Sequence, residues 1–369
     1  MKTRQWIWQN PDWPKFTYSI TELLPRLTSV NRLVGALEMT SRALAGEELL
    51  DAREKVLTDD VVETSAIEGE ILRRSSVRAS IRKQLGLPIT QDDSDRHTDA
   101  LVEMLLDARK CAASPLTEQK LFSWHAALFP TGYSGMHKIR VGKYRGAEQM
   151  KIVSGPVNRE KVHYIAPPEN RIENDMNRLL AYINKKSEPD PLLKAGIAHL
   201  RFIMIHPFDD GNGRIARAIT DYILAAEYCH LMQIVTLSKQ ISLDRKGYYS
   251  TLEKAGKNGL DITPWLSWFL ETVFKALHES RWTIDRIMQK VQFWKKHRDT
   301  LLNARQHKVL NRLLDSGEKF EGGMTTRKYA GMTKCSKVTA SRDLSDLEEK
   351  KILRKRPGGG RSTSYEIAL

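Results

Sequence analysis

Apolar residues recur every three or four positions along most of the first 280 residues, which places them on one face of a helix. The segments with this spacing are 20–57, 57–72, 97–112, 117–129, 172–183, 192–205, 215–224 and 262–277. Thr117 and Glu118 mark the start of one of these helices, and Pro130 marks its end. We therefore expect a mainly α fold for this part of the chain.

Two short segments break the helical spacing. Gln149–Val153 and Val162–Ile165 alternate between apolar and polar residues, and Gly155 and Pro156 lie between them. Alternation on either side of such a turn predicts a β-hairpin. The polar run at 90–95 predicts a loop.

The C-terminal end of the chain has a pattern of its own. Its expected elements are a basic connecting helix at 282–302, short helices at 308–314 and 326–331, a longer helix from Cys335, and strands at 352–355 and 364–367. Glycines at 358–360 mark the tip between the two strands. Three helices followed by a β-hairpin predict a winged helix-turn-helix.

These patterns divide the chain into four expected parts. They are an N-terminal helical region at 1–96, a helical core at 97–280, a connecting helix at 281–302 and the winged helix-turn-helix at 303–369. In the first part, residues 6–18 contain three tryptophans and two other aromatic residues beside two prolines. Prolines exclude a regular helix and exposed rings are costly, so we expect a strap packed on a larger body.

Composition narrows the class of protein. With 41% hydrophobic and 28% charged residues, and no run of about 18 uncharged apolar residues, we expect a soluble cytoplasmic protein without a membrane partner. Cys111, Cys229 and Cys335 are odd in number and widely spaced. We therefore expect neither a disulfide framework nor a zinc site.

One segment concentrates residues that can carry chemistry. His206 ends an apolar helical run, and Pro207 stops the helix there because proline has no backbone donor. Gly211 and Gly213 flank Asn212, so the backbone can turn tightly and direct N–H groups at an anion. The next helix begins here, and the N-terminus of a helix also binds anions.

The charged side chains of the same segment suit a phosphate ester. Arg214 and Arg217 lie three residues apart, and each guanidinium can hold phosphate oxygens with two hydrogen bonds. Asp210 offers a hard oxygen ligand for Mg²⁺ beside such a phosphate. His206 titrates near neutral pH and can accept a proton from a hydroxyl group. The alternative, a capped loop before a salt-bridged helix, requires no such combination.

The run from His206 to Arg217 resembles the signature H-P-F-x-[DE]-G-N-G-R-x-x-R of the Fic (Fido) family, and every specified position matches. The resemblance implies a Fic catalytic core at 97–280 that transfers AMP from ATP to a hydroxyl group of a protein. It makes His206 the base and Asp210 the Mg²⁺ ligand. It assigns the nucleotide phosphates to Gly211, Asn212, Gly213, Arg214 and Arg217.

A second motif lies upstream, in a helix expected at about 52–72. The sequence TSAIEG at 64–69 resembles the inhibitory motif [ST]-x-x-x-E-[GN] of the same family. The resemblance implies that Glu68 pairs with Arg217 in place of the γ-phosphate, so that ATP cannot settle for attack. The alternative is an ordinary glutamate before a glycine helix cap. In some relatives this glutamate supports removal of AMP, which is left open.

The resemblance also assigns roles outside the signature. It makes the expected β-hairpin the flap, which pairs with the backbone of the target as an added strand. It places Tyr248 and Tyr249 near the nucleotide base, although both are at helical spacing and the alternative is a place in the core. The aromatic strap resembles a short N-terminal domain found on one branch of the family.

The charge distribution adds a second hypothesis. Residues 281–369 contain 21 Lys and Arg against 10 Asp and Glu, which is +11 of the net +14. The third helix of a winged helix-turn-helix enters the major groove of DNA, and its wing meets phosphates. The candidate contacts are Ser336, Lys337, Thr339, Ser341, Arg342, Arg354, Lys355, Arg356 and Arg361. The alternative is a protein-docking module.

Two classes of function are therefore weighed. One is a Fic-type protein adenylyltransferase held off by Glu68, and the other is a DNA-binding regulator whose core senses a nucleotide or a partner. Catalysis is favoured because a sensor would not need His206 as a base. Another donor than ATP is left open. The expected partners are ATP, Mg²⁺, a protein with a Ser, Thr or Tyr hydroxyl group, and DNA, and a homodimer is left open.

Overall fold

The structure is a computed structural model. It describes residues 6–368 except 44–46, 90–92, 112–113, 155–158, 187–188, 258, 317–319 and 358–362. The chain divides into two compact units, residues 1–280 and 281–369. Among the described residues, no helix combines the length and the apolar character that spanning a bilayer requires.

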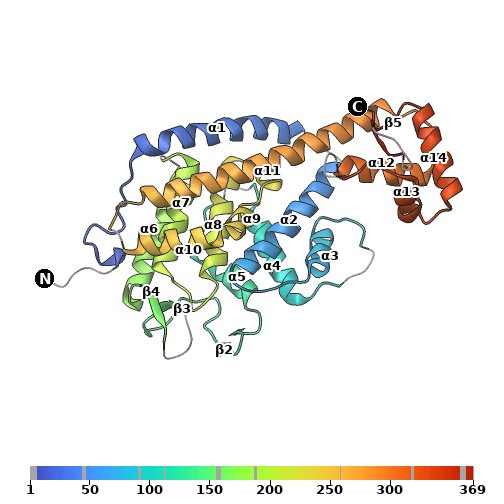
Figure 1. Cartoon of the computed structure of the whole chain (residues 1–369). Coiled ribbons are helices and arrows are strands. Elements are labelled where there is room, and N and C mark those ends of the chain that lie inside the picture. The colour runs from blue at the N-terminus through green and yellow to red at the C-terminus, as the bar shows by residue number, and fades with distance from the viewer. Residues whose placement is uncertain are drawn as a thin grey trace. The chain divides into compact units, whose positions relative to one another are not determined.

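The first unit consists of helices with two short β-hairpins (Figure 1). Its elements are η1 (Ile7–Gln9), α1 (Ile20–Ala43), α2 (Glu47–Ile67), α3 (Arg74–Gln84), α4 (Arg96–Ala108), α5 (Glu118–Leu128), β1 (Tyr133–Ser134), β2 (His137–Lys138), β3 (Lys151–Ser154), β4 (Lys161–Ile165), α6 (Glu169–Asn184), α7 (Pro191–Ile205), α8 (Asn212–Glu227), η2 (Leu231–Gln233), α9 (Ser238–Leu243), α10 (Arg245–Lys257) and the start of α11 (Thr263–Lys296). The mainly α fold expected from the helical spacing is confirmed.

Helices α7 and α8 pack side by side at the centre of this unit (Figure 1). Thirteen of the fifteen residues of α7 are buried, so protein surrounds this helix. Gly196 allows α11 to approach, because a Cβ atom at this position would lie 2.9 Å from the ring of Phe269. The indole of Trp265 donates a hydrogen bond of 2.8 Å to the Gly196 carbonyl. The first part of α11 thus packs closely against α7.

The N-terminal boundaries differ from the prediction. The first helical run does not divide at Leu57, since α2 continues through it. Helix α2 ends at Ile67 rather than at 72, because Gly69 has a φ of 86° and the Glu70 N–H bonds to the Ser65 carbonyl, which is a Schellman motif. Helix α3 lies between the expected helix that ends at 72 and the expected loop at 90–95, where we predicted no element.

The aromatic strap packs on the body of the unit as expected. Trp6 and Trp13 are buried. The indole of Trp8 donates to the Ile165 carbonyl at 2.7 Å, and the Trp6 ring meets Tyr164 edge to face. Both contacts are with β4. This strand pairs antiparallel with β3 in the predicted hairpin, whose Gly-Pro turn lies outside the described residues.

The prediction that the cysteines form no disulfide is wrong for two of them. Cys111 follows α4 and Cys229 follows α8, and the two residues are joined by a disulfide across 118 positions. Because α4 packs against α8, their C-terminal ends lie together, and nothing in the local sequence signals this. Cys335 is a free, half-buried cysteine.

A buried ion network lies next to this disulfide. Arg109, only 2% exposed, donates to Asp60 of α2 at 2.7 Å and to Asp221 of α8 at 2.9 Å. Burial raises the pKa of Asp221 to about 6. One guanidinium therefore joins α2 and α8 to the end of α4, and it compensates two carboxylates that would otherwise be buried without a partner.

The second unit contains the end of α11, then α12 (Ala304–Ser316), α13 (Thr326–Thr333), α14 (Lys337–Glu349), and the antiparallel strands β5 (Leu353–Lys355) and β6 (Tyr365–Ile367). Its core includes Tyr329, whose hydroxyl donates to Asp343 at 2.9 Å, and Arg305 pairs with the same carboxylate. The order of helices and strands is the predicted one. However, α11 is one continuous helix instead of two, because His278–Arg281 contain neither glycine nor proline.

We expect Arg109→Ala to lower the free energy of unfolding by about 3–5 kcal/mol, because it leaves Asp60 and Asp221 buried without their counter-charge. The measurement is denaturant unfolding of the full chain followed by circular dichroism. Lys110→Ala, next in sequence but exposed, is the matched control and should change stability little. A loss below about 1 kcal/mol for Arg109→Ala would contradict a structural role of the network.

Candidate active site

Helix α7 positions His206. The helix ends at Ile205, and the His206 N–H still bonds to the Phe202 carbonyl at 2.9 Å. His206 has a φ of 50°, a conformation that residues other than glycine rarely adopt. The Arg145 side chain donates to the His206 carbonyl at 2.8 Å and so braces this turn.

The His206 imidazole is neutral at physiological pH. Its Nδ1 atom lies 3.3 Å from the Ile203 carbonyl, which can only accept, so Nδ1 carries the proton and Nε2 carries the lone pair. Burial lowers the pKa of His206 to about 4. The side chain is therefore in the protonation state that a general base requires.

The loop after His206 is closed by Asn212. Its side chain accepts from the Phe208 N–H at 3.0 Å and donates to the Phe208 carbonyl at 2.8 Å. Gly211 makes the turn with a φ of 78°, and a Cβ atom there would lie 2.8 Å from the Phe129 ring. Since the Asn212 side chain is used inside the loop, its contribution to an anion site is the backbone N–H.

Gly213 does not make the turn that we expected of it. It belongs to the first turn of α8 and has helical backbone geometry, so it does not help Gly211 to turn the chain. A Cβ atom on Gly213 would lie 2.1 Å from Oε1 of Glu68. The missing side chain therefore makes the space in which the Glu68 carboxylate lies.

Arg217 is 3% exposed and lies against the end of α2. Its Nη2 atom is 2.9 Å from Oε1 of Glu68, which is the ion pair that the resemblance implied. Thr64 also holds this guanidinium, through its side chain at 2.7 Å and its carbonyl at 2.9 Å. Three atoms of the TSAIEG segment thus contact one arginine.

Arg214 has its own partner, which the sequence analysis did not identify. Its Nη1 atom lies 2.9 Å from Oε2 of Glu70, and its guanidinium lies 5.1 Å from the centre of the Phe129 ring. Among the described residues, Nε of Arg214 and Nη1 of Arg217 are buried without a hydrogen-bond partner. Unpaired donors on two buried cations suit the oxygens of a phosphate group.

Asp210 lies at the other side of the loop. Its Oδ1 accepts from the Gly211 N–H at 2.5 Å, and its Oδ2 accepts from the Ser134 hydroxyl of β1. The described residues contain no group of three acidic, His or Cys side chains that could hold a metal. This donor set does not fit a metal held by protein alone. It fits Mg²⁺, which commonly binds one or two carboxylates together with substrate phosphates.

The two tyrosines lie in different surroundings. Tyr248 is 1% exposed and its hydroxyl lies 2.9 Å from Nε2 of His199, which places it in the core. Tyr249 is 41% exposed, donates to the Ile67 carbonyl at 3.1 Å and lies 3.5 Å from Glu68. Tyr249 therefore borders the candidate site, whereas Tyr248 is a core residue.

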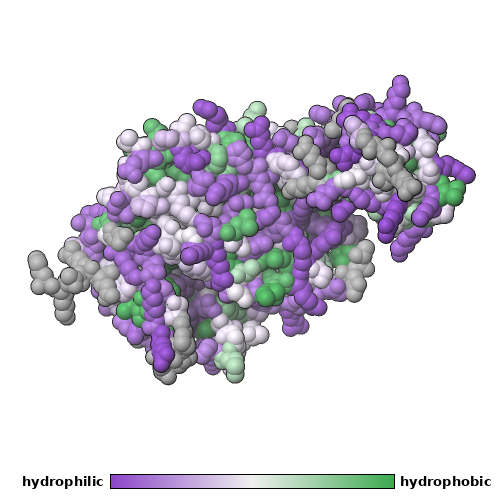
Figure 2. Space-filling view, in the orientation of Figure 1, coloured by the Kyte–Doolittle hydropathy of each residue, from purple (hydrophilic) through white to green (hydrophobic). Residues whose placement is uncertain are grey.

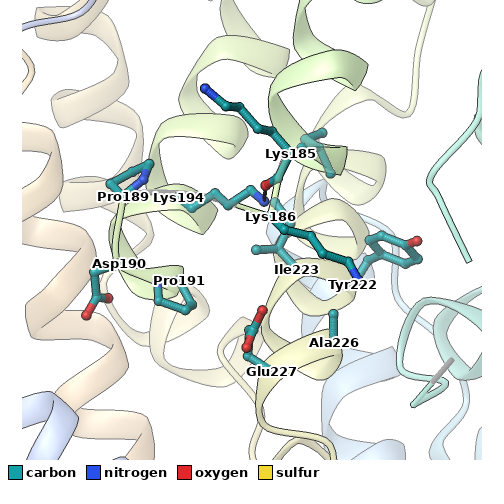
Figure 3. A pocket seen from close by; sticks show the side chains of 11 residues that line it. Lys185, Lys186, Pro189, Asp190, Pro191, Lys194, Tyr222, Ile223, Ala226 and Glu227 are labelled. Atoms are coloured by element: carbon teal, nitrogen blue, oxygen red, sulfur yellow. Dashed lines mark hydrogen bonds between the residues drawn. The ribbon is translucent and has the colours of Figure 1, made fainter. Parts of the chain in front are cut away.

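A cavity of about 310 Å³ lies apart from these residues, beside the C-terminal half of α8 (Figure 3). Lys194 spans it and donates to the Lys185 carbonyl at 2.7 Å (Figure 3). The cavity is lined by no residue of the signature.

On the face shown in Figure 2, hydrophilic residues predominate and hydrophobic residues form small separate patches.

A comparison with known protein families matches the part of the chain that contains the candidate site. Residues 115–224 match the Fic/DOC family, and residues 6–87 match a family described as a domain of unknown function (DUF4172). The chain therefore contains a Fic/DOC domain, which includes the whole signature. A Fic family protein from Desulfovibrio desulfuricans G20 has a similar structure, with a TM-score of 0.60 at 20% identity over 96% of this chain and 98% of that one. This similarity shows that the fold is a Fic fold.

Curated relatives are similar at low identity. A protein adenylyltransferase fic-1 of Caenorhabditis briggsae is 28% identical over 44% of this chain and 31% of its own length. A protein adenylyltransferase Fic of Nematostella vectensis is 25% identical over 56% of this chain and 44% of its own. The matched region thus spans less than half of these relatives.

We expect the His206 imidazole to stay neutral down to pH 5, because its pKa lies about 4, whereas an exposed histidine titrates near 6.5. The measurement is a pH titration of the protein labelled with ¹³C in its histidine rings, followed by NMR. The His206→Gln variant identifies the signal by its loss. A midpoint near 6.5 would contradict the neutral state.

Proposed function

We propose that this chain is a protein adenylyltransferase, which transfers AMP from ATP to a Ser, Thr or Tyr hydroxyl group of a protein. The observation that carries the proposal is the convergence of a neutral His206, the Asp210 carboxylate and two buried arginines at the start of α8. The relatives named protein adenylyltransferase support it.

In this proposal, Nε2 of His206 accepts the proton of the target hydroxyl while the hydroxyl oxygen attacks the α-phosphorus. The bond between the α-phosphorus and the α,β-bridging oxygen breaks, so pyrophosphate leaves and AMP remains on the target. Arg214, Arg217 and the free N–H groups at the start of α8 neutralise the charge of the phosphates. Mg²⁺, held by Asp210 and the phosphates, would withdraw further charge from them.

Glu68 is proposed as an inhibitor of this reaction. Its carboxylate holds Arg217 and lies in the space left by Gly213, at the N-terminus of α8. A helix N-terminus favours one anion there, and the carboxylate excludes a phosphate from the same place. ATP can then bind productively only after Glu68 leaves.

We expect Glu68→Gly to raise self-modification by ATP about 5- to 150-fold, the range of a typical coupling between two sites. Adding His206→Ala should lower it again by about 10²–10⁴-fold, because the base is lost. The measurement is incubation of the full chain with Mg²⁺ and ATP labelled on its α-phosphate, with label on the protein scored.

Each alternative predicts a different result in that experiment. Label that persists in the double variant would contradict the role of His206. No label in any variant would favour another donor, which the same assay tests with other labelled nucleotides, or a core that only senses a nucleotide. Label that is equal in the wild type and Glu68→Gly would contradict inhibition by Glu68.

We infer a second activity, DNA binding, for the C-terminal unit. It is supported by two consecutive helices, α13 and α14, followed by the β5–β6 hairpin, and by the exposed residues Lys337, Ser341 and Arg342 of α14 and its N-cap Ser336. Thr339 is half-buried. The wing favours the proposal less, because Arg354 and Arg356 pair with Glu366, and Lys355 pairs with Glu348. Arg361 lies outside the described residues.

If about four phosphates are neutralised, the affinity for a DNA duplex should fall about 100-fold between 50 and 200 mM salt. Fluorescence anisotropy of a labelled duplex measures it. Reversing the charge of Lys337 and Arg342 should abolish binding, whereas Arg354→Ala, whose cation is already paired, is the control with little effect. Absence of binding at 50 mM salt would contradict the inference and favour protein docking.

A further inference from the structure

Both signature arginines are already paired with carboxylates from one short segment. Glu68 contacts Arg217, and Glu70, two residues later, contacts Arg214 at 2.9 Å. The family motif that suggested Glu68 ends at Gly69, so it assigns nothing to Glu70. The pairing of Arg214 is therefore a separate feature that the fold alone reveals.

Glu70 is held on its other side by His97 of α4. Oε1 of Glu70 lies 2.7 Å from Nε2 of His97, while Oε2 is the atom that meets Arg214. The hydrogen bond from His97 is the main cause that keeps the pKa of Glu70 below its ordinary value, and Glu70 in turn raises the pKa of His97. The Glu70 carboxylate is thus ionised and fixed with one oxygen on each partner.

The segment that carries both glutamates lies between two anchored helices. We name residues 68–73, which connect α2 to α3, the latch segment. Glu54 of α2, which is 4% exposed, is paired with Arg78 and Arg82 of α3. Helix α2 is also held by the buried Arg109 network. The latch segment can therefore change without either helix leaving the body.

We propose that Glu70 is a second inhibitory carboxylate, which competes with a nucleotide phosphate for Arg214 independently of Glu68. This inference rests on the proposed function, since it concerns the same nucleotide site. Arg214 is buried, with 7% of its side chain exposed, and it needs a counter-charge in either state. Glu70 provides that charge when nucleotide is absent, and a phosphate replaces it when nucleotide binds.

In this arrangement, Glu70 affects the affinity for nucleotide phosphates rather than the rate of the chemical step. Glu70 contacts Arg214 and His97, and neither contact involves His206, which holds the proton-accepting atom. Removal of Glu68 alone leaves Arg214 occupied, so part of the inhibition remains. Full access for the phosphates requires both carboxylates to leave.

The test measures binding of inorganic triphosphate with Mg²⁺ to the full chain by calorimetry, which needs neither adenine recognition nor catalysis. The variants are the wild type, Glu68→Gly, Glu70→Gln and the double variant. We expect Glu70→Gln to tighten binding about tenfold in both backgrounds. Glu103→Gln, which removes an exposed carboxylate of α4, is the matched control and should bind as its parent does.

A second readout separates the inference from the proposed function. Label from ATP in the same variants should show a lower KM and an unchanged kcat for Glu70→Gln in the Glu68→Gly background. Tighter triphosphate binding without any label would uphold Glu70 and overturn the adenylyltransferase. Label in Glu68→Gly with unchanged or weaker triphosphate binding in Glu70→Gln would overturn the inference, because Glu70 would then position Arg214 instead of competing for it.

Protein folding is checked by the unfolding temperature of each variant. Glutamine keeps the shape of Glu70 and its ability to contact His97, but it leaves buried Arg214 without this counter-charge, so Glu70→Gln should unfold at a lower temperature than the wild type, and binding is measured well below that temperature. If Glu70→Gln does not fold, Glu70→Asp replaces it in the test. The shorter side chain should weaken the contact with Arg214 and should therefore tighten triphosphate binding, as expected for Glu70→Gln. Unchanged triphosphate binding by a folded Glu70→Asp would likewise overturn the inference.

Discussion

Two arginines buried at the positive end of a helix impose the main constraint on this structure. Arg214 and Arg217 are 6% and 3% exposed and lie in the first two turns of α8, near the end where the backbone presents its N–H groups. A buried cation without a partner is costly, and here two cations lie near a positive helix end. The site therefore requires anions at all times, from the protein or from a ligand.

Much of the first unit serves to supply and fix those anions. Helix α7 is buried and holds α8 in place, and Asn212 closes the loop between them. The Arg109 network joins α2 to α8, so the C-terminal end of α2 lies next to Arg214 and Arg217. Gly69 ends α2 and Gly213 opens the space opposite, which lets the Glu68 carboxylate reach Arg217.

The sequence predicted what a local pattern or a family motif carries, and it missed contacts between distant residues that no motif carries. The signature loop and the Glu68–Arg217 pair were predicted because dense motifs carry them, and α7 was predicted from its apolar run. Glu70 was missed because its partner lies 144 positions away, and the Cys111–Cys229 disulfide because it joins two helix ends. Gly213 was interpreted as a turn residue. The reason for a glycine at this position is the space that it leaves for Glu68, and that contact exists only in the folded protein.

The same constraint determines how the site can switch. In the proposed function, Arg214 and Arg217 keep a counter-charge in both states, so binding of a phosphate would exchange one anion for another instead of creating new ion pairs. Such an exchange is nearly balanced, so its net free energy is small compared with the individual interactions. Since ion pairs anchor α2 and α3, the proposed exchange would need only the short latch segment to move, and its conformational cost would be correspondingly low. A change in that segment can therefore shift the balance without disturbing the core that positions His206.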